Sequence, residues 1–309
     1  MVTTDIETVK EVSLPATAKV RAYVALLKPR LSFLVAFSAA FGYLLASSGA
    51  SLQWVSFLGV CLGGFLVSGA SIIINQIIEK DLDKLMGRTQ GRPLPLGKIS
   101  VQEAKLYTWI VGASGLLLLG ATTNALTTGL ALLSMVLYGF IYTPLKRVGP
   151  VAVFIGAIPG ALPPLLGWVA VTNQVTYEAL AIFFLQFLWQ FPHFWAIAWV
   201  LDQDYRKAGF KLLPSAQGRN MHTAFQMMLY TFFLIPMSWL PAFIGTTGLT
   251  SALVASACGL LFMWPSLRLM RLCVDNPTTL EASAEAKRIM FGSFIYLPVV
   301  QIAFLMDKL

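Results

Sequence analysis

Apolar segments about as long as a lipid bilayer is thick recur along almost the whole chain. A helix needs about 20 mostly apolar residues to span the hydrocarbon core. Nine segments of about that length can be placed, with approximate bounds 31–48, 53–77, 106–122, 126–143, 151–171, 178–200, 224–245, 249–270 and 289–306. Only the short stretch TTNAL separates the third from the fourth, so a single bent hairpin is an alternative there. The pattern predicts an all-α polytopic membrane protein with about nine transmembrane helices.

The composition supports lipid as the solvent. Of the 309 residues, 57% are hydrophobic and only 12% are charged. A soluble domain of this size could not bury so much apolar surface. Cys61, Cys258 and Cys273 lie in or beside apolar segments and lack metal-ligand spacing, so we interpret them as small apolar residues.

The basic residues fall almost entirely on one side of the expected membrane. With these nine segments, 21 of the 22 Lys and Arg residues lie in the N-terminal tail or in alternate loops, and Lys308 alone lies opposite. Cytoplasmic loops are enriched in Lys and Arg, so the tail and these loops are expected in the cytoplasm. The net charge of +8 is therefore mostly a sign of topology, and we expect no nucleic-acid partner. A bacterial inner membrane is the simplest location.

The N-terminal residues differ from a cleaved targeting segment. They show no compact apolar core followed by a cleavage site, and they carry Asp5, Glu7 and Glu11, whereas transit peptides avoid acids. We expect residues 1–22 to be a polar cytoplasmic tail and residues 23–309 to be a single transmembrane domain.

An acidic stripe follows the second apolar segment. Asn75, Glu79 and Asp83 are four residues apart, so a continuous helix would place all three on one face. Oxygen ligands of this kind suit Mg²⁺, which prefers carboxylates, waters and substrate phosphates. Arg88 and Arg92 follow, again four residues apart. A polar helix cap is the plainer interpretation, but carboxylates beside arginines favour a site for a metal and a phosphate.

A second acidic cluster lies on the same predicted side of the membrane. Asp202 and Asp204 follow the sixth segment and precede Lys207, a pattern also common at exposed helix ends. The loop YTPLKRVGP adds Tyr142, Lys146 and Arg147, although a basic pair after a membrane helix is often only a topology marker. Two acidic clusters with basic loops between them indicate a diphosphate-binding cage.

The sixth segment carries an unusual polar stripe. Gln186, Gln190 and His193 share one helix face, and Trp189 stands among several aromatic residues there. Polar groups in a membrane helix normally face the interior of a bundle or a cavity. Hydrogen bonding between helices is the alternative for the glutamines. Arg30, at the start of the first segment, either reaches lipid phosphate or faces a substrate.

These motifs resemble a known family. NQIIEKDLD resembles the first aspartate-rich motif of the UbiA-type intramembrane prenyltransferases. Within that family the closer resemblance is to the protoheme IX farnesyltransferases, or heme O synthases. It rests on DLDKLMGRTQGRPLP, YTPLKR, GALPPLLGWVAVTN, WQFPHFWAIAW and DYRKAGFKLLP, and it covers roughly residues 22–305. It implies a UbiA-like helical bundle around a central cavity. The implied reaction joins the farnesyl group of farnesyl diphosphate to a vinyl group of heme b, with addition of water and with Mg²⁺ as cofactor.

The resemblance also implies roles for individual residues. A porphyrin needs a flat apolar slot and often an imidazole near its iron. The expected catalytic residues are Asn75, Asp83, Lys146 and Asp204; the metal ligands are Asn75, Glu79, Asp83, Asp202 and Asp204; the diphosphate-binding residues are Arg88, Arg92, Tyr142, Lys146, Arg147 and Lys207; and the heme pocket holds His193, Trp189, Gln190 and Arg30.

This sequence departs from the family motif at two points, and other functions stay open. Glu79 stands where the motif has its first aspartate, and Asp202 and Asp204 are two residues apart instead of four, so which of them binds metal is open. One alternative is a relative with another acceptor, such as a quinone precursor or a chlorin. A transporter of heme or an anionic lipid is a second. Expected partners are membrane lipid and, as protein candidates, heme A synthase or the oxidase assembly machinery.

Overall fold

Every expected apolar segment forms a helix in the computed structural model, which describes residues 15–47, 52–215 and 217–309. Within those residues, nine helices are long and apolar enough to cross a membrane, which confirms the all-α polytopic fold. The elements are α1 (Ala16–Leu26), α2 (Pro29–Ala46), α3 (Trp54–Ile78), α4 (Lys80–Asp83), α5 (Val101–Thr122), α6 (Ala125–Val136), η1 (Leu137–Tyr142), α7 (Thr143–Leu145), α8 (Val151–Thr172), α9 (Tyr177–Val200), α10 (Asp202–Lys207), α11 (Met221–Met237), α12 (Leu240–Phe243), α13 (Leu249–Asp275) and α14 (Leu280–Met306).

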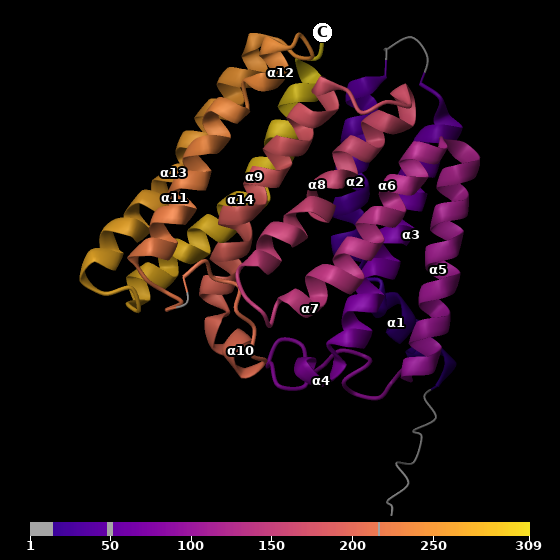
Figure 1. Cartoon of the computed structure of the whole chain (residues 1–309), viewed down its shortest axis with the longest axis horizontal. Helices are drawn as coiled ribbons and strands as arrows, with labels where there is room; N and C mark the ends of the chain where they lie inside the picture. The colour runs from indigo at the N-terminus through magenta and orange to yellow at the C-terminus, as the bar shows by residue number, and fades with distance from the viewer. Residues whose placement is uncertain (1–14, 48–51, 216) are drawn as a thin grey trace, which may run out of the picture.

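The long helices lie side by side and roughly antiparallel to their neighbours along the chain (Figure 1). Helix α3 packs on α5, α2 packs on α8, and α9 packs on α8, α11 and α14. The segment TTNAL is not a bend in one helix, because α5 ends at Thr122 and the Asn124 side chain caps a new helix by accepting a bond from the N–H of Thr127.

Two crossings bring helix backbones into direct contact. A Cβ added to Gly42 of α2 would lie 1.8 Å from the carbonyl oxygen of Pro164 in α8. A Cβ added to Gly167 of α8 would lie 1.9 Å from the carbonyl oxygen of Ala39 in α2. Small residues permit such close approach in membrane helices, where van der Waals packing drives association. These glycines therefore set the distance between α2 and α8.

The fourth apolar segment contains a break in α-helical geometry. Between α6 and α7, the six residues Leu137–Tyr142 form a wider π-helical turn, and the hydroxyl of Thr143 bonds the carbonyl of Tyr138 at 2.9 Å. Turns of this kind are rare and frequently occur at functional sites. This one lies at the end of the bundle that holds the acidic stripe.

A short helix precedes the first spanning helix. Helix α1 begins within residues 1–22, which we expected to form a polar tail, and its residues Ala22 and Leu26 are buried against Ile73 of α3 and Ile99. Ala22 and Leu26 are four residues apart and therefore share one face of the helix. The acidic residues of the expected tail, Asp5 to Glu11, lie outside the described residues.

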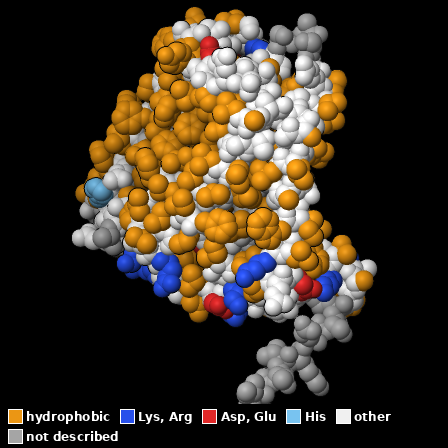
Figure 2. Space-filling model, turned by 45° about the vertical axis from the view of Figure 1, so that its right-hand side comes forward, with side chains coloured by type: hydrophobic (Ala, Val, Ile, Leu, Met, Phe, Trp, Pro, Cys, Tyr) orange, Lys and Arg blue, Asp and Glu red, His pale blue; other side chains and the backbone are white. Residues whose placement is uncertain are grey.

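The two ends of the bundle differ in charge. Helices α4 and α10 lie near each other at one end, and α12 and the C-terminus lie at the other (Figure 1). On the face drawn in Figure 2, Lys and Arg side chains form a band at the first end, and hydrophobic side chains cover most of the surface above it. We call the end with α4, α10 and the loop at Lys146 the charged end.

Candidate active site

The acidic stripe lies where α3 leaves the bundle at the charged end. The N–H of Glu79 bonds the carbonyl of Asn75 at 2.9 Å, and the N–H of Asp83 bonds the carbonyl of Glu79 at 2.7 Å. Helical hydrogen bonding thus continues from α3 into α4, and the three side chains project from one face. All three are buried. Asp81 lies off this face, is exposed and pairs with Lys84.

Each carboxylate of the stripe has a cationic partner from a distant part of the sequence or from the following loop. Lys146 Nζ donates to Glu79 Oε1 at 2.8 Å, and Arg92 Nη1 donates to Asp83 Oδ2 at 2.5 Å. None of these four side chains is more than 15% exposed. Buried ion pairs form at a desolvation cost, and removing one partner leaves an uncompensated charge. Lys146 and Arg92 could therefore pair with a strongly anionic ligand only if another cation neutralised Glu79 and Asp83.

The second acidic cluster faces the first through one of its two aspartates. Backbone N–H groups of Gly87 and Arg88, just after α4, bond the carboxylate of Asp204. Lys207 Nζ lies 3.3 Å from the same carboxylate. Burial raises the pKa of Asp204, but the hydrogen bonds from Lys207, Arg88 and Gly87 outweigh it and hold the pKa below its ordinary value. Asp204 is thus ionised and joins α10 to the loop after α4.

Asp202 points elsewhere. Its Oδ2 lies 3.0 Å from Nε of Arg206 and 3.6 Å from Nε of Arg219, which precedes α11. The structure therefore separates the two aspartates that the sequence left as equal candidates. Asp204 lies against the loop of the acidic stripe, and Asp202 ties α10 to the segment before α11.

The π-helical turn places aromatic and hydroxyl groups against the stripe. Asn75 Nδ2 donates to the hydroxyl of Thr143 at 3.1 Å. The Lys146 ammonium lies 4.7 Å from the ring centre of Tyr142 and 5.6 Å from that of Phe210. Cation–π contacts of this kind hold an ammonium in place without adding negative charge. Tyr138, one turn before Tyr142, extends this wall into the bundle, and its ring centre lies 5.3 Å from that of Tyr142.

Lys28 belongs to the same site, and the sequence analysis missed it. It lies between α1 and α2 in a left-handed backbone conformation, with φ of 44°. Burial, together with the positive charges of Arg92, Lys146 and Arg88, lowers its pKa to about 7, although Asp83 acts in the opposite direction. The only signal in the sequence was the run Lys-Pro-Arg directly before the first apolar segment. Four cations therefore gather around a stripe with two carboxylates, which leaves an excess of positive charge for an anion.

A pH dependence follows from the lowered pKa of Lys28. A bound diphosphate stabilises the protonated ammonium and so raises its pKa above about 7. Binding of an alkyl diphosphate should therefore take up a proton and weaken as the pH rises from 7 to 9. We expect Lys28→Met to lower the affinity roughly tenfold at pH 6.5, the value of one charge-assisted hydrogen bond, and to flatten the pH dependence.

Isothermal titration with a non-hydrolysable alkyl diphosphate at several pH values would measure this. The exposed Lys98→Met, in the same loop as Arg92, is the matched control, because it removes one positive charge away from the stripe. Equal pH slopes for the wild type and Lys28→Met would contradict the assignment of Lys28.

The stripe offers ligands for a hard cation. Among the described residues, no three Asp, Glu, His or Cys side chains already converge as a metal site. The individual donors nevertheless fit Mg²⁺ in type. Asp83 Oδ1 is buried without a hydrogen-bond partner. Asn75 uses its amide nitrogen on Thr143, which leaves its carbonyl oxygen free of that bond. An unpaired buried carboxylate oxygen is costly and calls for a ligand.

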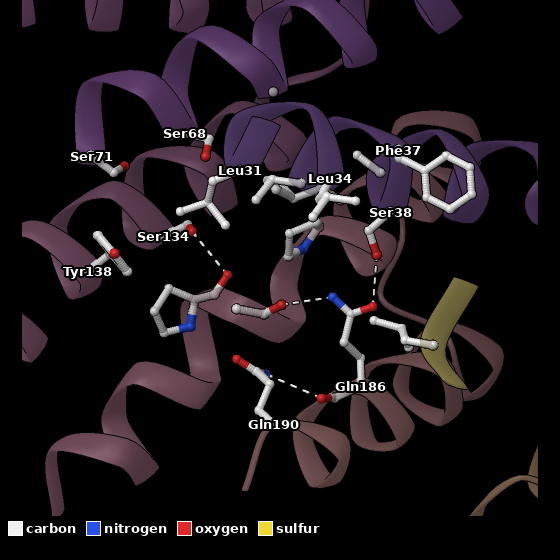
Figure 3. A pocket seen from close by; sticks show the side chains of 18 of the residues that line it. Leu31, Leu34, Phe37, Ser38, Ser68, Ser71, Ser134, Tyr138, Gln186 and Gln190 are labelled. Atoms are coloured by element: carbon white, nitrogen blue, oxygen red, sulfur yellow. Dashed lines mark hydrogen bonds between the residues drawn. The ribbon is translucent and has the colours of Figure 1, made fainter. Parts of the chain in front are cut away.

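A cavity of about 290 Å³ lies within the bundle, deeper along α3 than the stripe. Its wall begins at Ser71, one helical turn deeper than Asn75, and at Tyr138 of the π-helical turn, and Figure 3 shows both at one side of the cavity. Leu34 of α2 and Phe294 of α14 line it and are 51% and 47% exposed, so the wall is not closed on this side. No charged side chain is among the residues that line it. The cavity suits an apolar chain whose charged group stays at the stripe.

The glutamines of α9 mainly join helices. Gln186 Nε2 donates to the carbonyl of Gly160 in α8 at 2.8 Å, and its Oε1 accepts bonds from Ser38 of α2 and Gln301 of α14 (Figure 3 draws the first two). Gln190 Nε2 donates to the carbonyl of Ala157 in α8 at 2.8 Å. Both glutamines also line the cavity. The amide groups of both glutamines therefore form hydrogen bonds between helices, which is the alternative that the sequence left open.

His193 lines the same cavity and is 8% exposed. Trp189 stacks on it, with ring centres 4.6 Å apart and planes 16° from parallel. Phe194 and Phe294 each make an edge-to-face contact with the imidazole, with ring centres 5.2 Å apart. The imidazole is thus held among aromatic neighbours at the cavity wall.

The remaining expected residues lie at the margin of the site. The side chains of Arg88 and Arg147 are exposed. Arg30 is exposed and has no ion pair or hydrogen bond within the described part of the chain, and it lies four residues before the cavity-lining Leu34. His222, treated as a surface residue, is exposed and contacts Gln226.

Comparisons with known proteins find relatives over most of the chain. The sequence profile of the UbiA prenyltransferase family matches residues 35–293. The protoheme IX farnesyltransferase of Cytophaga hutchinsonii is 50% identical over 94% of this chain and 98% of its own length. The protoheme IX farnesyltransferase of Flavobacterium psychrophilum is 42% identical over 91% of this chain and 92% of its own length.

Solved structures show the same fold. A structure of digeranylgeranylglyceryl phosphate synthase superposes with a TM-score of 0.75 at 20% identity, covering 94% of this chain and 98% of its own. A UbiA homologue from Archaeoglobus fulgidus bound to DMAPP and Mg²⁺ gives a TM-score of 0.64 at 19% identity, covering 91% of this chain and 98% of its own.

Proposed function

We propose, since the chain belongs to the UbiA prenyltransferase family, that it transfers the farnesyl group of farnesyl diphosphate to a vinyl group of heme b. Water is added in the same reaction, and the products are heme O and diphosphate. The name shared by its relatives supports this acceptor. The observation that carries the proposal is a cation-rich acidic stripe at the charged end with an uncharged cavity, lined in part by His193, deeper in the bundle.

Each part of the substrates has a matching part of the site. The diphosphate lies at the charged end, where Lys28, Arg92 and Lys146 face it. The farnesyl chain lies in the uncharged cavity. The porphyrin lies beside His193 and Trp189, about 16 Å from Asp204 if α9 is followed at roughly 1.5 Å per residue. The acceptor thus lies far from the diphosphate but within reach of the prenyl chain.

The reaction begins with loss of the leaving group. The bond between the allylic carbon and oxygen breaks, the electron pair stays on diphosphate, and an allylic cation forms. Arg92 and Lys146 stabilise the growing negative charge as positioned donors. Asn75, Glu79, Asp83 and Asp204 would hold Mg²⁺, which supplies charge neutralisation of the diphosphate. In the resting arrangement, Lys146 and Arg92 neutralise the carboxylates; with metal and diphosphate bound, we propose that they turn to phosphate oxygens.

The acceptor steps need shielding rather than a protein nucleophile. The vinyl group attacks the allylic cation, the new bond leaves a cation next to the porphyrin, and water adds to it with loss of a proton. Trp189 and Phe194 exclude bulk water and present ring faces that stabilise a cation. Uncontrolled hydrolysis of the allylic cation is thereby reduced.

The test supplies purified protein in lipid nanodiscs with heme b, farnesyl diphosphate and Mg²⁺, followed by extraction of the hemes. Heme O and one equivalent of diphosphate are expected. Release of diphosphate only with a quinone precursor or a chlorin would assign another acceptor. Movement of heme across a sealed vesicle without any diphosphate release would indicate a transporter.

The orientation in the membrane is also a proposal. We propose a bacterial inner membrane with the charged end and the N-terminus in the cytoplasm, because the basic residues gather at that end. The heme O formed there would pass to heme A synthase or the oxidase assembly machinery. A reporter fused at Gly91 or Gly209 should report cytoplasm, and one at Gly248 should report the opposite side. Opposite results for Gly91 and Gly209 would be incompatible with one site formed by both loops.

A further inference from the structure

The hydrogen bonds around His193 define its protonation. His193 Nδ1 lies 2.7 Å from the hydroxyl oxygen of Ser293 in α14. The Ser293 hydroxyl also donates to the carbonyl of Met290 at 2.6 Å. A serine hydroxyl has a single hydrogen. Because that hydrogen lies toward Met290, the hydrogen between His193 and Ser293 must belong to Nδ1, and Nε2 carries a free lone pair.

The ring is also fixed in orientation. Trp189 stacks on His193, and the Trp189 indole N–H donates to the carbonyl of the same Ser293 at 3.0 Å. Ser293 is fully buried. It contacts the His193 ring through its hydroxyl and the Trp189 ring through its carbonyl. Within the described residues no hydrogen bond is made by Nε2, and His193 lines the cavity. The free lone pair is therefore held at a cavity wall.

The surroundings favour a metal ligand over a proton acceptor. Among the described residues no charged side chain lines the cavity, so an imidazolium formed there would be buried without a counter-charge. A neutral imidazole with one N–H bonded and the other nitrogen free is the usual form of a histidine that binds a metal. Trp189 and Phe294 pack against this ring and line the same cavity, so the wall around His193 is aromatic and apolar, as a porphyrin requires. Iron is the Lewis acid of such a porphyrin.

We propose that Ser293 is a positioning residue that holds His193 with Nε2 directed at the iron of the porphyrin substrate. This inference rests on the proposed function, since it takes heme b as the acceptor. Ligation would fix the porphyrin against α9 and so place one vinyl group toward the prenyl chain. A hydroxyl partner polarises the imidazole less than a carboxylate does. The resulting iron bond is weaker, as a substrate that must leave requires.

The test measures binding of ferrous heme b and of metal-free protoporphyrin IX to the protein in nanodiscs, without farnesyl diphosphate. Metal-free porphyrin fills the same slot but cannot be ligated. The wild type should prefer heme b and show the iron–histidine stretching band in resonance Raman spectra. His193→Ala should abolish both the preference and the band. Ser293→Ala should lower heme b affinity about tenfold or more, the usual effect of losing a partner of a metal ligand, with unchanged affinity for metal-free porphyrin.

Two controls separate positioning from packing. Ser134→Ala in α6 removes another hydroxyl that lines the cavity, and it should leave the affinity for both porphyrins unchanged. Ser293→Thr keeps a hydroxyl and should retain the heme b affinity that Ser293→Ala loses. In His193→Gly, added imidazole should restore ligation better than 1-methylimidazole, whose methyl group replaces the N–H that Ser293 accepts. This comparison leaves Ser293 unchanged, so it holds even if Ser293→Ala does not fold.

The outcomes are distinct. An unchanged preference for heme b in Ser293→Ala, or equal rescue by the two imidazoles, would overturn the role of Ser293. An unchanged iron–histidine band in His193→Ala would overturn ligation itself. Ligation without any heme O in the extraction assay would refute the proposed function and leave this inference standing. Formation of heme O by a protein with no preference for the iron porphyrin would support the proposed function and refute this inference.

Discussion

Asp83→Asn is expected to lower the rate of prenyl transfer by about 100-fold or more, the effect of removing a preorganised charge stabiliser. The Asp83 side chain is fully buried, one of its oxygens accepts from Arg92, and the other has no partner. Asparagine keeps the shape but removes the charge that a metal requires. Steady-state release of diphosphate over a range of Mg²⁺ concentrations measures the effect, and a higher Mg²⁺ requirement should accompany the loss.

A matched control lies two residues away. Asp81 is exposed and pairs with Lys84, away from the stripe, so Asp81→Asn should retain nearly the wild-type rate. The double variant Asp83→Asn with Arg92→Met addresses a second interpretation, in which Asp83 serves only to neutralise Arg92. Recovery of activity in the double variant would support that interpretation and contradict a metal-binding role. Continued loss is the expected result.

The sequence predicted those parts of the molecule that depend on local patterns. Span length and apolar content located the nine helices that, among the described residues, are long and apolar enough to cross a membrane, because lipid forces each backbone to satisfy its hydrogen bonds within a helix. Four-residue spacing likewise placed Asn75, Glu79 and Asp83 on one face. Both features are properties of a single segment, so a single segment was enough to reveal them.

Other parts of the site depend on which segments meet. Ser293 contacts His193 from 100 residues away, and nothing in its own surroundings distinguishes it from other serines. Lys28 matters because Arg92 and Lys146, from two other segments, lie near it. The choice between Asp202 and Asp204 depends on the backbone of the loop after α4. Periodicity and composition contain no information on such pairings.

The contact between α2 and α8 predicts a second large effect, on folding rather than on chemistry. Gly42→Ala places a methyl group 1.8 Å from a backbone oxygen of α8, and Gly167→Ala places one 1.9 Å from a backbone oxygen of α2. Backbone cannot rotate away as a side chain can, so the helices must separate. We expect each variant to lose on the order of 3 kcal/mol, at the upper end for overpacked cores, seen as a lower unfolding temperature in detergent.

Separation of these two helices should also change the shape of the cavity. Ser38 and Ala39 of α2 and Pro163 and Leu166 of α8 all line the cavity, so the same movement should change the space for the prenyl chain. Gly129→Ala in α6 is the control, because nothing lies within 4 Å of the added Cβ and alanine favours the helix. That variant should match or exceed the wild type in unfolding temperature. If Gly42→Ala matched it as well, close backbone contact would not determine the position of α2, and the cavity wall would have to be set by the hydrogen bonds of Gln186 instead.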